Sequence, residues 1–389
     1  MIEIIKKEAC SGCSACVSAC KNDCITMCED KEGFIYPEVL KSKCVECGAC
    51  SSACPIINKN KHTNDRAESF AVVAKNEKIR LTSSSGGVFS LLAERIVADG
   101  GIVYGAVFNK HFQVEHVAAN NIEALYAMRG SKYVQSRVGD AYVDIENNLC
   151  ANRTILFTGT PCQIAGLKAY LGREYDTLIC ADIVCHGVPS PKLWREYLLD
   201  KEKKFHSAIK RVSFRDKEIS WQQFLIKIEF ENNKVYKNIH TKDLYMRAFL
   251  RNFSLRPSCF ECNFKGIDRH ADITLADLWG SASISPELHD GKGTSFVIVH
   301  TEKGAALLEK ITNQCLIQPI ELDAAISHNL SLIKSEKKSG DRDLFMKEFC
   351  ENGCRRAFDK FCKDTYIDVT KKAFRKSRII AKRLLGRKG

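Results

Sequence analysis

The chain has 389 residues, of which 45% are hydrophobic and 27% are charged. These are ordinary globular values, so they exclude a collagen-like chain and wholesale disorder, and the length predicts two or three domains. The net charge of +12 is concentrated at one end, because residues 371–389 hold nine lysines and arginines and no acidic residue. No run of about 18 apolar residues occurs, so we expect no membrane-spanning helix.

The 20 cysteines pose a choice between disulfides and metal ligation. The first residues, MIEIIKKEAC, lack the apolar core of a secretory signal. We therefore expect a soluble cytoplasmic protein whose cysteines bind metal rather than pair in disulfides.

Residues 1–58 are dense in cysteine and are predicted to form one compact α+β module. The pattern C-x2-C-x2-C-x3-C occurs twice, and Pro55 follows the second copy. Three thiolates spaced in this way hold one face of an iron–sulfur cube, while the fourth reaches a second cube. The spacing predicts crossed ligation of two 4Fe-4S clusters, one by Cys10, Cys13, Cys16 and Cys54, and the other by Cys44, Cys47, Cys50 and Cys20.

This module resembles the bacterial two-cluster ferredoxins along most of its length. Lys21 departs from their pattern, because proline usually follows the first copy. Structural zinc is the alternative, but zinc usually takes paired C-x2-C knuckles separated by a longer loop. Cys24 and Cys28 have no place in the spacing, and we interpret them as small buried apolar residues.

A polar stretch at 59–67 is expected to be a linker, and residues 68–345 have the pattern of an α/β domain with a mixed sheet. Strands are predicted at 70–74 and 102–108, with a helix at 88–98 between them. The clearest unit is strand–helix–strand at 154–184, whose parallel strands end on one edge of the sheet. An antiparallel layer is expected at 209–240, a return to α/β at 293–320, and a basic helical tail at 346–389.

Two segments of the α/β domain have the composition of an anion site. The sequence TSSSGGVFS (82–90) lies at the start of the 88–98 helix, where free amides and glycines suit a flavin phosphate; a simple helix cap is the alternative. The sequence RGSKYVQS (129–136) places Arg129 and Lys132 in a turn, which alone is equally typical of a solvated basic turn.

Four further cysteines predict a third 4Fe-4S cluster. Cys162 and Cys185 follow the two parallel strands and are expected to be neighbours, while Cys259 and Cys262 form a chelating C-x2-C pair. The alternatives are a lone reactive thiolate at Cys162, and a redox disulfide or half a zinc site at the C-x2-C pair. His186 is a candidate catalytic proton donor, with a structural histidine as the alternative.

Six segments follow the ferredoxin module in an order that resembles the coenzyme F-420 hydrogenase/dehydrogenase beta-subunit family. They are SSSGGVFS, RGSKYVQS, GTPCQIAGLK, CHGVPSP, the C-x2-C pair and DITLADLWG. The resemblance covers most of residues 1–300, and it implies a domain that binds FAD and passes electrons between iron–sulfur clusters and an organic two-electron acceptor. It implies flavin contacts by Ser84, Ser85, Gly86, Gly87, Arg129, Ser131 and Lys132, and a cluster on Cys162, Cys185, Cys259 and Cys262.

We therefore expect an iron–sulfur flavoprotein oxidoreductase that relays single electrons from ferredoxin, or another low-potential redox protein, to a flavin that reduces or oxidises an organic substrate. A non-catalytic electron-transfer subunit and an oxygen-sensing regulator are the alternatives. The tail at 371–389 suits an anionic membrane surface or an acidic partner, unless it is simply solvated. Nucleic acid is not expected, because no stacking aromatic residues interleave with the cations.

Overall fold

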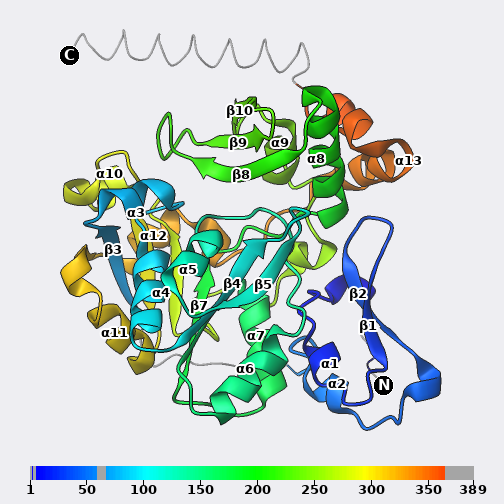
Figure 1. The fold of residues 1–389 in the computed structure, drawn as a ribbon, viewed down its shortest axis with the longest axis horizontal. Coiled ribbons are helices and arrows are strands. Elements are labelled where there is room, and N and C mark those ends of the chain that lie inside the picture. Colours follow the sequence, from blue (N-terminus) through cyan, green and yellow to red (C-terminus); the bar gives the residue numbers. More distant parts are fainter. Residues whose placement is uncertain (1, 3–5, 59–66, 364–389) are drawn as a thin grey trace.

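The computed structural model describes residues 2, 6–58 and 67–363. An eight-stranded mixed sheet lies at the centre, with a cysteine-rich N-terminal module on one side and a small antiparallel sheet above it (Figure 1). Among the described residues, no helix has both the length and the apolarity that a membrane span requires. The predicted linker, apart from its last residue, and the predicted basic segment at 371–389 lie outside the described residues.

The large sheet confirms the prediction of an α/β fold with a mixed sheet. In sheet order its strands are β13 (Cys315–Pro319), β3 (Glu68–Ala74), β12 (Ser295–Val299), β11 (Ile273–Asp277), β7 (Leu178–Ile183), β6 (Ile155–Gly159), β4 (Ile102–Phe108) and β5 (Val114–Ala119). The four strands from β11 to β4 run parallel, and the flanking pairs are antiparallel. The predicted strand–helix–strand unit is therefore the middle of the sheet.

Helices cover both faces of this sheet. They are α3 (Glu77–Thr82), α4 (Val88–Ala98), α5 (Ile122–Met128), α6 (Ala141–Cys150), α7 (Pro161–Leu171), α10 (Ser281–Ile284), α11 (Glu302–Glu309) and α12 (Leu322–Ser327). Alternate strand residues point to opposite faces, so Leu156 packs with α4, α5 and α11, while its neighbours Ile155 and Phe157 pack with α6 and α7.

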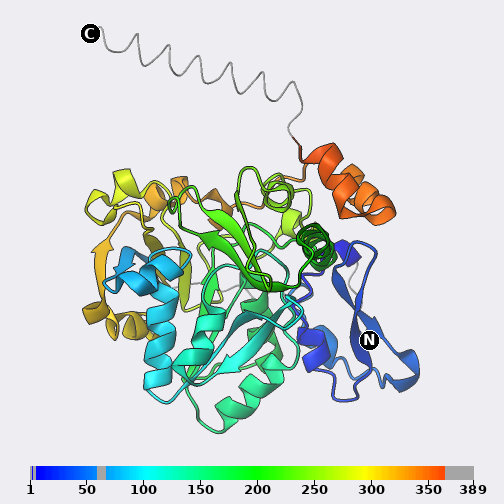
Figure 2. The same cartoon turned by 45° about the horizontal axis from the view of Figure 1, so that its top comes forward.

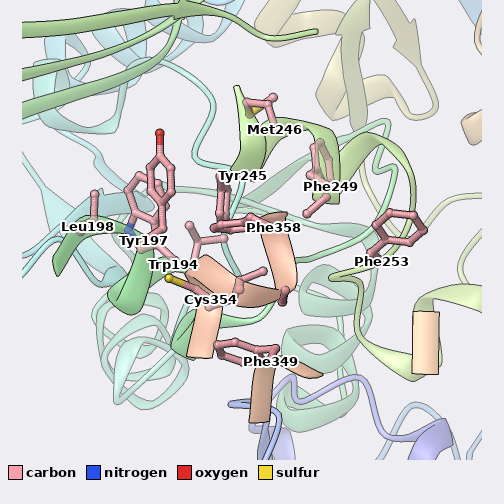
Figure 3. Close-up of a cluster of buried hydrophobic side chains, with 14 of the residues drawn as sticks. Trp194, Tyr197, Leu198, Tyr245, Met246, Phe249, Phe253, Phe349, Cys354 and Phe358 are labelled. Carbon is pink, nitrogen blue, oxygen red and sulfur yellow. The ribbon is translucent and has the colours of Figure 1, made fainter. Parts of the chain in front are cut away.

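The small sheet is the predicted antiparallel layer, with strands β8 (Ile209–Asp216), β9 (Leu225–Phe230) and β10 (Val235–Ile239). It packs with α8 (Pro191–Phe205), α9 (Leu244–Leu250) and α13 (Arg342–Phe361) around a cluster of aromatic side chains (Figure 3). The ring of Trp194 lies 4.8 Å from that of Phe214 and 4.9 Å from that of Tyr245. At the end of β8, Arg215 pairs with Asp277 at the end of β11, which brings the small sheet to the carboxyl edge of the large one.

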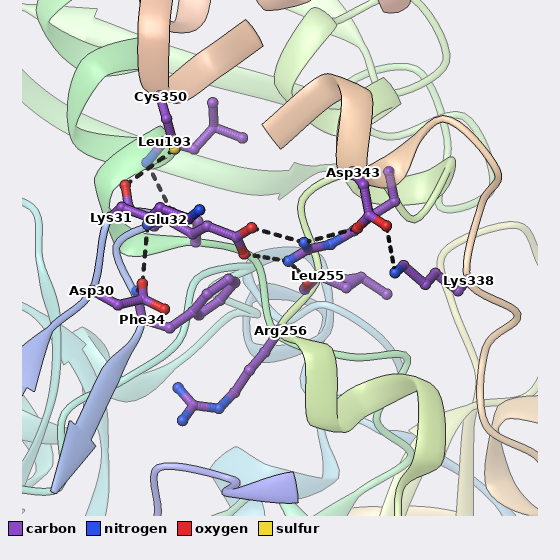
Figure 4. Close-up of polar contacts among 12 residues, drawn as sticks. Asp30, Lys31, Glu32, Phe34, Leu193, Leu255, Arg256, Lys338, Asp343 and Cys350 are labelled. Atoms are coloured by element: carbon purple, nitrogen blue, oxygen red, sulfur yellow. Dashed lines mark hydrogen bonds and ion pairs between the residues drawn. The ribbon is translucent and has the colours of Figure 1, made fainter. Parts of the chain in front are cut away.

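The N-terminal module contains two short helices, α1 (Ala15–Ser18) and α2 (Ala49–Ser52), and a hairpin of β1 (Ile25–Glu29) and β2 (Ile35–Val39). It lies beside α6, α7 and α8 (Figures 1 and 2). Ion pairs join its hairpin to the large domain, from Arg195 to Glu29 and from Arg342 to Glu32. Figure 4 shows Glu32 of the second pair with its dashed contacts. The approach to α7 is close, because a Cβ at Gly166 would lie 2.9 Å from the Sγ of Cys13.

Candidate functional site

The first predicted set of thiols lies together in the N-terminal module. Cys16 experiences the charges of Cys13, Cys10 and Cys54, so both copies of the cysteine pattern contribute to one group. Burial raises the pKa of the Cys13 thiol to about 11, and repulsion from Cys10 and Cys54 adds to that rise. Bare thiolates in this arrangement repel one another, and a cationic iron core would relieve the repulsion.

The second predicted set gathers at the far side of the module. Cys20, Cys44 and Cys50 pack in one cluster of side chains, and Cys47 is exposed at its rim. Cys24 belongs to the same group, because its Sγ lies 3.2 Å from the Sγ of Cys20. Cys24 is buried, as predicted, but it also stands beside thiols that the spacing assigns to a cluster.

The third predicted set lines one small cavity of the large domain, as Cys162, Cys185, Cys259 and Cys262. Cys162 lies in the first turn of α7, directly after β6, and Cys185 follows β7, so parallel strand ends bring them together. Burial raises the pKa of the Cys162 thiol well above its usual value, and repulsion from Cys262 and Cys185 contributes.

The third set also adjoins the first. Cys13 exerts a charge effect on Cys162, and Ser11 and Ile56 of the N-terminal module line the small cavity. Two thiol sets, one in each part of the chain, therefore face each other across the junction.

A second cavity of ≈ 690 Å³ opens at the carboxyl edge of the large sheet. Its walls come from the serine loop at 83–89, the turn at 128–136, the ends of β6, β7 and β11, and the small sheet. Cys162, Cys185 and His186 line both this cavity and the small thiol cavity. The two cavities are thus neighbours that share part of their walls.

The serine loop presents hydroxyl groups and the start of α4 to the large cavity. Ser84 Oγ accepts hydrogen bonds from the backbone amide and the hydroxyl of Ser131, over 2.7 and 2.9 Å. Ser85, Gly87 and Ser131 also line the cavity, although the hydroxyl of Ser85 donates to Thr294 O. Two of the predicted loops therefore meet, and α4 begins after Gly87 without a side-chain cap, so neither Ser84 nor Ser85 caps this helix.

Gly86 differs from its neighbours, since it is not among the residues that line the large cavity. Its amide donates to Ser295 Oγ over 2.9 Å, and a Cβ there would lie 2.3 Å from Val72 O. The structure thus gives Gly86 a packing role against the sheet.

The two basic residues of the predicted turn are held by the protein itself. Arg129 donates to Ser90 Oγ and Thr82 Oγ1 and pairs with Glu94. Lys132 Nζ lies 3.2 Å from the carbonyls of Met128 and Gly130, and burial lowers its pKa to about 7. Both side chains line the large cavity.

His186 is fixed from two sides. Its Nδ1 lies 3.2 Å from Glu336 Oε1, and its Nε2 lies 2.8 Å from Asn252 Oδ1. The hydrogen bond from His186 holds the pKa of Glu336 at about 2. Both ring nitrogens of His186 therefore face side-chain oxygen atoms.

Two basic residues that hold the serine loop, Arg215 at the cavity wall and Lys217 behind it, were not found from the sequence. Arg215 is buried, pairs with Asp277 over 2.8 Å and donates to Ser84 O. Lys217 donates to the carbonyls of Arg80, Ser85 and Lys292 over 2.7–2.8 Å. These cations hold the serine loop by its carbonyl groups. They have no spacing signal, but Asp277 lies within the DITLADLWG motif.

Comparison with protein families agrees with this arrangement. Residues 152–324 match the family of the C terminus of the coenzyme F420 hydrogenase/dehydrogenase beta subunit, and residues 9–57 match the 4Fe-4S dicluster domain. A chain of the F420-reducing NiFe hydrogenase complex from Methanosarcina barkeri is similar in structure, with 16% identity and a TM-score of 0.45. That alignment covers 77% of this chain and 91% of the other. No curated protein sequence gives a significant match.

The family match includes the strand ends that carry Cys162 and Cys185, the C-x2-C pair and Asp277, and the dicluster match includes both four-cysteine runs. The dicluster model supports iron–sulfur clusters over structural zinc in the N-terminal module. Residues 152–324 are therefore similar to the C-terminal domain of the coenzyme F420 hydrogenase/dehydrogenase beta-subunit family, and a 4Fe-4S dicluster domain precedes them at residues 9–57.

Proposed function

We propose that the chain is an iron–sulfur flavoprotein oxidoreductase that relays single electrons from a ferredoxin-like donor to a flavin, which reduces or oxidises an organic substrate. The observation that carries this proposal is the contact between the thiol sets and the large cavity. Cys13 acts on Cys162, and Cys162 and Cys185 line both cavities. The order of the sites supports electron flow between the N-terminal module and the large cavity.

The residues present fit three 4Fe-4S clusters, each with four cysteine thiols. The cluster nearest the surface would be held by Cys20, Cys44, Cys47 and Cys50, and the next by Cys10, Cys13, Cys16 and Cys54. The third would be held by Cys162, Cys185, Cys259 and Cys262. Because Cys47 and its neighbour Val45 are exposed, the first of these clusters is the entry point for an external donor.

The large cavity fits a flavin, because its volume lies within the range of about 300–1,000 Å³ that is usual for cofactor sites. The Ser84 hydroxyl and the first amides of α4 supply donors for the phosphates of FAD. Ser131 holds the Ser84 hydroxyl, and Arg215 and Lys217 keep the loop in place. A bound flavin would supply the exchange between one-electron and two-electron steps. His186 holds a proton at the boundary between the two cavities, where a substrate at the flavin needs one.

A non-catalytic electron-transfer subunit is the second candidate. The exposed thiol of Cys47 favours this function as much as it favours the oxidoreductase, because both need contact with an external redox partner. The two functions differ in turnover, since an electron-transfer subunit accepts electrons but converts no small molecule. The substrate is not defined by the described residues. A cytoplasmic location, and a membrane or acidic partner for the basic segment at 371–389, remain predictions.

The experiment that tests the proposal is anaerobic purification with iron, sulfide and flavin analysis and electron paramagnetic resonance of the reduced protein. About twelve irons and one flavin per chain are expected. Cys162→Ser should lose about four irons, while Cys150→Ser, an exposed cysteine outside all sets, serves as the control. About eight irons without flavin in the wild type would contradict the third cluster and the flavin site together.

Flavin binding is tested separately at Ser84, because its hydroxyl lines the cavity without supporting the sheet. Ser84→Ala should weaken flavin binding by about fivefold, the value of one hydrogen bond of roughly 1 kcal/mol. Gly86 is unsuitable for this test, since any side chain there would collide with Val72 O. Unchanged flavin affinity in Ser84→Ala would contradict the phosphate assignment.

A further inference from the structure

Arg256 is a fully buried cation at the junction between the N-terminal module and the large domain, with 0% of its surface exposed. Its Nε donates to Cys10 O over 2.8 Å, its Nη2 to Ile35 O over 2.9 Å, and its Nη1 to Gln135 Oε1 over 3.1 Å. The guanidinium carbon lies 4.2 Å from the centre of the Tyr36 ring. Each of these partners is a neutral group.

The absence of a carboxylate partner sets Arg256 apart within the described part of the chain. Four other buried arginines pair with acids, as Arg80–Asp290, Arg215–Asp277, Arg269–Asp182 and Arg342–Glu32. Asp30 and Glu32, both labelled in Figure 4, pair with Lys7 and Arg342 and not with Arg256. A buried charge without a counter-charge is costly, so another source of negative charge is expected near Arg256.

Two thiol sets lie on either side of this cation. Arg256 bonds directly to the carbonyl of Cys10 and precedes Cys259 by one turn of 3-10 helix. The Cys259 amide donates to Arg256 O over 3.0 Å, and the Arg256 amide donates to Val188 O over 3.0 Å. The amide of Val188 donates in turn to Cys259 Sγ over 3.5 Å. Arg256 therefore adjoins the third set as well as the first.

We propose that Arg256 is the counter-charge shared by these two inner clusters and that it raises their reduction potentials. The inference rests on the proposed function, because it requires clusters on both sets. Reduction of a cluster takes one electron from the donor and adds one negative charge, which a fixed cation in a dry junction stabilises. The surface cluster lacks this cation, so electrons that enter there move inward to sites of higher potential.

The test is a redox titration of the purified holoprotein with dithionite, followed by electron paramagnetic resonance. In Arg256→Gln, the one-electron reduction equilibrium of the inner clusters should become at least tenfold less favourable, which corresponds to 59 mV. Arg256→Lys should retain most of the wild-type potential because it keeps the charge. Arg342→Gln is the matched control, because Arg342 is a buried arginine of the same junction that already has a carboxylate partner.

A second variant covers the case in which Arg256→Gln loses iron. Gln135→Glu keeps the side chain length and places a carboxylate against Nη1 of Arg256, so it should lower the same potentials without removing the cation. Loaded clusters with unmoved potentials in both variants would overturn the inference, and so would an equal shift in Arg342→Gln. A wild-type protein without clusters would instead overturn the proposed function itself.

Discussion

Gly166, in the middle of α7, offers a sharp test of how closely the N-terminal module must approach the large domain. A Cβ at this position would lie 2.9 Å from Cys13 Sγ, 3.0 Å from Cys13 Cβ and 3.1 Å from the hydroxyl of Tyr142. The hydroxyl has little freedom to retreat, because it donates to Gln163 O over 2.7 Å. Cys13 has equally little freedom once its sulfur is bonded to iron.

The cost of Gly166→Ala should therefore depend on the cluster. Overpacking a filled site costs about 1–3 kcal/mol, whereas alanine gains up to ~1 kcal/mol over glycine inside a helix. In the cluster-free protein Cys13 can rotate and relieve its Sγ contact, whereas the contacts with Cys13 Cβ and the Tyr142 hydroxyl are common to both forms. In the loaded protein the collision remains, and we expect Gly166→Ala to lower the cluster's contribution to the free energy of unfolding by about 1–3 kcal/mol.

Denaturant unfolding of the loaded and cluster-free forms measures this difference, and iron release to a chelator measures the same loss kinetically. Gly340→Ala is the control, because a Cβ at Gly340 meets no atom within 4 Å. A Gly166→Ala protein that holds its iron as firmly as the wild type, with equal or greater stability in the loaded form, would refute the close packing of Cys13 on α7.

Three further predictions concern buried groups. Burial lowers the pKa of His116 to about 4. Between about pH 6.5 and pH 4 the unfolded chain therefore binds more protons at His116 than the folded chain does. The free energy of unfolding should fall by about 3 kcal/mol as the pH drops through that window. His116→Gln should remove that part of the fall in denaturant titrations at the two pH values. Cys24→Ala should retain all iron, while Cys20→Ala should lose about four irons. Iron loss from Cys24→Ala and not from Cys20→Ala would show that Cys24, not Cys20, is the cluster ligand. Lys217→Met should weaken flavin binding about tenfold by releasing three carbonyls of the loop region; unchanged flavin fluorescence titrations would show that Lys217 does not position the loop.

Elements with strong local signals were predictable from the sequence. The helix at 88–98 and the strand at 102–108 were predicted with the bounds that the structure has, because glycines end the helix and an apolar run defines the strand. The parallel order of β6 and β7 followed from the handedness of a strand–helix–strand unit. That order alone predicts that Cys162 and Cys185 lie on one edge of the sheet.

Features that depend on distant pairing could not be predicted in the same way. β5 mixes apolar with charged residues as an edge strand, and β11 is recognisable only by its pairing with β7 and β12. The roles of Arg215 and Lys217 arise because the small sheet reaches over the carboxyl edge of the large one. Gly86 was predicted as a phosphate contact, and its packing against Ser295 depends on a strand more than two hundred residues away.

The attachment of the N-terminal module has a consequence for the timing of electron transfer. Arg195, Arg256 and Arg342 join it to the large domain at separate points, and Gly166 lets it contact α7 directly. A module held in this way does not swing between a donor and an acceptor as a tethered carrier does. Internal electron transfer should therefore be insensitive to solvent viscosity, and added glycerol should slow only the encounter with the external donor.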